Sequence, residues 1–147
     1  MVASIITVFV VASIVLGLVL GGGPERIVAG TMAAMFAIDR VAHALFADYS
    51  PTALDLYHLV LDLAGLAAMV AVALTARRYW PLWACSSQLI SLFSHLAWLL
   101  GTGLPKPVYL VMDIAPSALI SCTVILGTAF HQLRLMRRGT DLSCKGS

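Results

Sequence analysis

Residues 52–76 read TALDLYHLVLDLAGLAAMVAVALTA, an apolar run long enough to cross a bilayer, since a transmembrane helix needs about 20 apolar residues. The run follows Pro51, which disfavours a helix that continues through it, and it ends at Arg77 and Arg78. Its first half contains two aspartates and a histidine. Such residues are costly in a membrane and usually face other helices or a wet cavity. The stretch therefore predicts a membrane-spanning helix with one polar face.

Four further apolar runs accompany this one, and short turns rich in glycine, proline or polar residues separate them. The five predicted spans cover residues 3–20, 27–46, 52–76, 80–100 and 108–133, and residues 134–147 form a basic tail. Short connections make consecutive helices antiparallel neighbours. A signal peptide has basic residues before its apolar stretch, and the first run has none. We therefore expect this run to be retained as a helix. The chain therefore predicts an all-α integral membrane protein, a single domain built as a bundle of five transmembrane helices.

The composition excludes several classes of protein. Of the 147 residues, 61 % are hydrophobic and 11 % are charged, whereas soluble domains carry about 25 % charged residues. This excludes a soluble globular enzyme, a disordered chain and a nucleic-acid-binding protein with a basic face. We expect the lipid bilayer to be the main partner of the chain.

The basic residues predict the orientation of the bundle, because cytoplasmic loops are enriched in Lys and Arg. One set of loops contains only Lys106. The other set contains Arg26, Arg77, Arg78, Arg134, Arg137, Arg138 and Lys145. This bias places the C-terminus and the basic tail in the cytoplasm and the N-terminus outside. The sequence therefore predicts a multi-pass protein of the inner (cytoplasmic) membrane.

Eight ionisable residues lie inside the predicted spans, and all of them fall in the outer half of the membrane at 1.5 Å per residue. They are Asp39, Arg40, His43, Asp55, His58, Asp62, His95 and Asp113. Residues three, four or seven positions apart share one face of a helix. Such spacing gives one polar face to each of four predicted helices. The faces are Asp39 with His43; Asp55 with His58 and Asp62; Gln88 with Ser91 and His95; and Asp113 with Ser117. We therefore expect four helices to present polar side chains at one depth. The first helix lacks them and is expected to be a lipid-facing flank.

The charge of this cluster needs compensation, because four aspartates and one arginine sum to −3 when the histidines are neutral. Protonated aspartates, protonated histidines or a bound cation would each supply it. Imidazoles and carboxylates without a thiolate suit Zn, Mn, Fe or Cu. The candidate ligands are His43, His58 and His95, with Asp39, Asp55, Asp62 and Asp113 as ligands or as acceptors for the ligating imidazoles. Arg40 would balance charge, or pair with Asp39 or Asp55 as a purely structural ion pair.

The order Asp39-x3-His43, an outer loop, then His58 resembles the Asp-x3-His…His copper site of the membrane subunit of particulate methane/ammonia monooxygenases. The resemblance covers only residues 39–58, the gap before His58 is longer, and this chain is much shorter than that subunit. It implies that ligands placed in this way at the outer membrane face can hold a metal. It does not extend to the activity.

These features favour a non-enzymatic membrane protein whose outer-half Asp/His cluster binds a metal ion or exchanges protons. The alternative is an accessory subunit or assembly factor of a larger membrane complex, with the cluster as structural ion pairs. A third hypothesis is a membrane enzyme that uses the metal for oxidation or hydrolysis. Five helices are few for a self-contained transporter, so we expect a homo-oligomer or a subunit of a complex.

Overall fold

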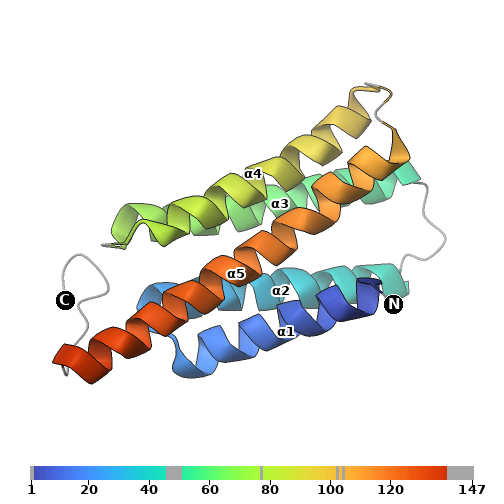
Figure 1. Ribbon diagram of the computed structural model, residues 1–147. Coiled ribbons are helices and arrows are strands. Elements are labelled where there is room, and N and C mark those ends of the chain that lie inside the picture. Colours follow the sequence, from blue (N-terminus) through green and yellow to red (C-terminus); the bar gives the residue numbers. More distant parts are fainter. Residues whose placement is uncertain (1, 46–50, 77, 102, 104, 139–147) are drawn as a thin grey trace.

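Five α-helices make up nearly all of the computed structural model, which describes residues 2–45, 51–76, 78–101, 103 and 105–138 (Figure 1). The helices are α1 (Val2–Leu20), α2 (Gly23–Leu45), α3 (Pro51–Thr75), α4 (Trp80–Leu99) and α5 (Lys106–Arg138). These ranges contain no β-strand. The predicted all-helical class and the number of helices are therefore confirmed.

Three segments are long and apolar enough to cross a membrane, namely Gly23–Leu45, Leu56–Thr75 and Ile114–Arg137. The described apolar part of α1, Ser4–Leu20, is shorter. Helix α4 has the length of a span, but serines, a glutamine and a histidine lower its hydropathy. The three apolar helices indicate that the protein associates with a membrane.

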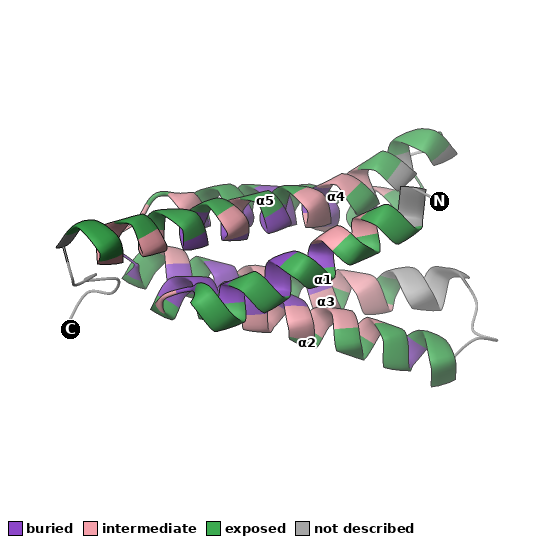
Figure 2. Ribbon diagram, turned by 60° about the horizontal axis from the view of Figure 1, so that its bottom comes forward, coloured by how far each residue is buried: buried purple, intermediate pink, exposed green. Residues whose placement is uncertain are grey.

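The helices close into a ring in chain order. Each packs against the next, α5 returns to pack against α1, and α2 also touches α5 across the interior. Figure 2 shows the buried residues turned toward this interior and the exposed ones on the outside. The apolar core takes residues from every helix, including Val10, Ile14, Val28, Met32, Met69, Val72, Ala84, Ile120 and Val124. The ring also buries some of the predicted polar residues, namely Asp62, Gln88, Ser91 and His95.

The ends of the helices differ from the predicted spans by a few residues. Helix α2 starts at Gly23, so Glu25 lies in its first turn, and α5 continues through Arg138 into the predicted tail. Between α4 and α5, Gly101 and Gly103 have φ of 65° and 68°. Residues with a Cβ atom rarely adopt this left-handed backbone conformation, whereas glycine adopts it freely. The glycines therefore allow the tight reversal that returns the chain to the bundle.

Helix α1 is more than a lipid-facing flank. It exposes Ile5, Val8 and Val19 on its outside, as expected for a flank. Its other face contributes Val10 and Ile14 to the core and buries Ser13 completely. The sequence does not reveal this inner face, because nearly all of α1 is apolar and hydropathy cannot separate a core face from a lipid face.

Gly17 brings α1 close to its neighbours. A Cβ at this position would lie 2.7 Å from Cβ of Ala29 and 2.8 Å from Val124. We expect Gly17→Ala to be less stable than Gly30→Ala by about 1–3 kcal/mol, because the added methyl forces helices apart. Gly30 is the matched control, since a Cβ there meets its nearest side-chain atom at 4.0 Å. Thermal unfolding in detergent measures the difference, and equal stabilities would contradict this packing.

Candidate metal centre

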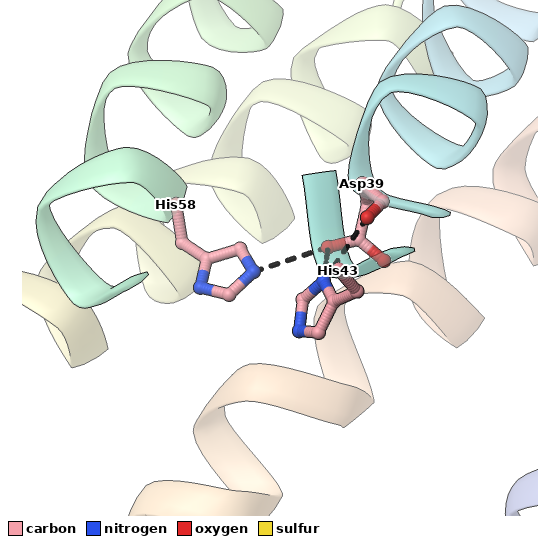
Figure 3. Close-up of side chains that lie close together, drawn as sticks. All are labelled: Asp39, His43 and His58. Atoms are coloured by element: carbon pink, nitrogen blue, oxygen red, sulfur yellow. Dashed lines mark hydrogen bonds and ion pairs between the residues drawn. The ribbon is translucent and has the colours of Figure 1, made fainter. Parts of the chain in front are cut away.

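Asp39 joins two histidines from different helices at the end of α2 and the start of α3 (Figure 3). Its Oδ1 atom lies 3.1 Å from Nε2 of His58 and 3.2 Å from Nδ1 of His43. The Nδ1 atom of His43 also lies 3.0 Å from the backbone oxygen of Asp39, one helical turn earlier. One carboxylate thus connects the i, i+4 partner on its own helix with an imidazole on the next.

The arginine beside this carboxylate is largely outside the bundle. Its Nη2 lies 3.4 Å from Oδ2 of Asp39, and its side chain is 67 % exposed. The guanidinium of Arg40 also stacks over the ring of Phe36 at 5.1 Å. Since an exposed ion pair contributes little energy, Arg40 balances the charge of Asp39 more than it holds the helices together.

The three histidines form a row that runs from the surface into the bundle. The ring of His58 lies 5.4 Å from that of His43 and 5.4 Å from that of His95, and it stacks on the latter. The exposed fraction of the side chain is 49 % for His43, 25 % for His58 and 3 % for His95. The row thus connects a solvent-accessible imidazole with a fully enclosed one.

A second aspartate lies at the inner end of the row. Nε2 of His95 is 3.6 Å from Oδ2 of Asp62. Ser91 donates a hydrogen bond of 2.6 Å to the same oxygen, and Gln88 donates one of 2.9 Å to Oδ1. Asp62 on α3 thus lies against His95 of α4. Gln88 and Ser91, which share a helical face with His95, thus donate interhelical hydrogen bonds from α4 to α3.

The two aspartates border a cavity of about 340 Å³. Its polar part is lined by Asp39, His58, Asp62 and His95, and its apolar part includes Met32, Met69 and Ile120. Residues of α1, including Thr7 and Val10, complete the wall. Both aspartates therefore border a partly open space between the helices.

The predicted cluster is thus resolved into two neighbouring groups that share the row of histidines. Asp39, His43 and His58 form one, while Asp62 and His95 form the other. The side chains of Asp55 and Asp113 lie outside the described residues. The expectation that they take part stays a prediction.

The first group has the donor atoms of a metal site. One carboxylate oxygen of Asp39 and one ring nitrogen each of His43 and His58 lie within 4.8 Å of one another. The nitrogens and oxygens bound to one zinc ion lie about 2.0–2.2 Å from it, so three donors this close to one another are near the spacing that a shared ion requires. Two imidazoles and one carboxylate suit Zn, Fe, Mn or Cu and leave positions open for water or another ligand.

One buried acid was not among the predicted candidates. Glu25, in the first turn of α2, is 1 % exposed, and Nε1 of Trp80 donates a 3.1 Å hydrogen bond to its Oε1. The sequence places Glu25 in a loop beside Arg26, where a solvated carboxylate is the ordinary expectation. The pair Gly23-Pro24 was the available signal, because proline is favoured in the first turn of a helix and Glu near its N-terminus.

Comparisons of the chain with protein-family models, with curated proteins and with solved structures found no match.

Proposed function

We propose that Asp39, His43 and His58 bind one divalent transition-metal ion, and that the protein is a small multi-pass membrane protein built around this site. The observation that carries the proposal is the convergence of three donor atoms from α2 and α3 within 4.8 Å. The donors come from two helices, so the fold itself brings them together. An acidic patch on the surface can form without such an arrangement. Oδ1 of Asp39 also lies within 3.2 Å of a ring nitrogen of each imidazole, and the charge of this carboxylate favours a cation at this position.

The purified protein is treated with a chelator and then titrated with metal in detergent. Calorimetry measures the affinity, and elemental analysis measures the number of ions per chain. We expect one Zn²⁺ or Cu²⁺ ion per chain, removed again by chelator. Because an imidazole must lose its proton to bind a metal, we expect the affinity to fall as the pH is lowered from about 8 to about 5. A stoichiometry near zero at pH 8 would reject the proposal. An affinity that does not change over this range would exclude the histidines as ligands.

Proton exchange is the second candidate, and the contact between His95 and Asp62 favours it. Both side chains are buried, they lie 3.6 Å apart, and the stacked ring of His58 connects them with the more exposed His43. An imidazole row of this kind can pass a proton from the surface to an internal carboxylate. In the alternative hypothesis, the protein is an accessory subunit of a larger complex and Asp39 only joins α2 to α3. This hypothesis predicts that the protein co-purifies with a stable partner and contains no metal.

We further propose that all five helices span the cytoplasmic membrane, with the N-terminus outside and the C-terminus inside. The distribution of Lys and Arg supports this orientation. A reporter that is active only outside the cytoplasm should be silent when fused after Ser147 and active when inserted at Asp48. The reverse pattern would place the Asp39 group at the cytoplasmic face, and activity at both positions would require an even number of spans between them.

A further inference from the structure

We propose that Glu25 on α2 and His131 on α5 form a second site that binds and releases a proton. The site is independent of the proposed metal centre. Glu25 and Asp39 lie on the same helix, separated by 14 positions, which corresponds to about 21 Å along the axis. Val28, Ala29 and Val124, all fully buried, belong to the apolar core between these two levels. The bundle thus has an ionisable group at each end.

The carboxylate of Glu25 is only partly satisfied. Its Oε1 atom accepts a hydrogen bond from Trp80, but its Oε2 atom is buried and has no hydrogen-bond partner among the described residues. A buried charged oxygen without a hydrogen bond is destabilising. A proton on Oε2 would remove this charge while leaving the bond from Trp80 intact.

His131 is the basic group next to this oxygen. A Cβ built on Gly22 would lie 3.0 Å from Oε2 of Glu25 and 2.8 Å from Nδ1 of His131. Oε2 of Glu25 and Nδ1 of His131 therefore both lie near the position where a Cβ of residue 22 would be. Because this residue is glycine, no side chain occupies that position. His131 is only partly buried, so its imidazole can exchange a proton with water. Binding of one proton from water changes the net charge of the pair from −1 to 0.

The surroundings contain few competing groups. Helix α1 has no ionisable residue. The start of α4 contributes Trp80, preceded by Arg78, and α5 contributes Arg134 one turn after His131. Arg26, the next residue on α2, is exposed. All three arginines keep their positive charge across the accessible pH range, so the proposal assigns the exchanged proton to Glu25 and His131.

Trp80 provides a built-in reporter for this site. Its indole donates directly to Glu25, and a Cβ on Gly127 would come within 2.9 Å of the same ring. The absence of a side chain at Gly127 thus lets α5 pack closely on the indole and hold it in place. The other two tryptophans, Trp83 and Trp98, are 69 % and 39 % exposed and can be replaced. A change in the charge of Glu25 therefore alters the emission of Trp80 alone.

The test is fluorescence of the Trp83→Phe/Trp98→Phe protein in detergent, recorded as a function of pH. We expect a single one-proton transition in Trp80 emission. Glu25→Gln should abolish it, since the amide keeps an acceptor for Trp80 but cannot ionise. His131→Gln should shift its midpoint, because the carboxylate then titrates without the imidazole. The matched control, His43→Gln at the metal centre, should leave the transition unchanged.

Glu25→Asp is a second variant for the case in which Glu25→Gln does not fold. The shorter aspartate keeps the negative charge but moves it away from Gly22. We expect a shifted midpoint in this variant. The proposal is overturned if Trp80 emission does not respond to pH, or if the transition is unchanged in the folded Glu25 variants. Either result leaves the metal centre untouched, because metal titration is measured separately.

Discussion

Replacing His58 with alanine is expected to abolish stoichiometric metal binding. His58 is the residue that brings α3 into the site, and its Nε2 lies 3.1 Å from Oδ1 of Asp39. Without it only Asp39 and His43 remain, two donors from a single helical turn. Loss of an outer partner of a ligand already weakens metal binding about 10–100-fold, so loss of a ligand should exceed 100-fold. Calorimetric titration and elemental analysis of the purified variant measure the effect.

His131→Ala is the matched control for this change. It also removes one imidazole, but from the opposite end of the bundle on α5. This variant should keep one metal per chain. If His58→Ala also keeps it, His58 is not a ligand and the proposed site is wrong. If neither variant nor the unmodified protein binds metal, and the protein co-purifies with one stable partner, the accessory-subunit hypothesis takes its place.

Replacing Asp62 with alanine is expected to give the largest loss of stability of any change discussed here. The carboxylate accepts hydrogen bonds from Gln88 and Ser91 and lies next to buried His95. Alanine leaves these polar groups without their acceptor inside the bundle. Removing one partner from a buried charged network costs about 3–5 kcal/mol. Denaturant or thermal unfolding in mixed micelles measures this loss.

Asp62→Asn separates the charge of this residue from its hydrogen bonding. The amide keeps the size of the side chain and one acceptor oxygen, so the variant should retain most of the stability lost in Asp62→Ala. If the row of histidines exchanges protons with Asp62, the pH-dependent proton uptake of the protein should disappear in Asp62→Asn. Uptake that is unchanged would remove Asp62 from the proton-exchange candidate. Equal stability of the alanine variant and the unmodified protein would contradict the buried network itself.

Local patterns in the sequence were sufficient for the helices and for the common level of Asp39, His58 and His95 along the bundle. A run such as 52–76 is apolar over the length of a span, and the turns beside it contain the glycines and prolines that end helices. Because the rise of a helix is constant, the register of Asp39, His58 and His95 follows from their distance to these turns. That these residues lie at one level of the bundle could therefore be predicted.

The sequence alone determined that this protein is a helical bundle with Asp39, Asp62 and three histidines at neighbouring levels. Only the tertiary structure decided which of them meet: Asp39 pairs with His58 and Asp62 with His95. The rotation of each helix about its axis makes that choice, and it depends on packing at every contact of the ring, which no single segment encodes. The burial of Glu25 has the same origin, because it depends on Trp80 of α4, which donates to Glu25 and packs against Gly127 of α5.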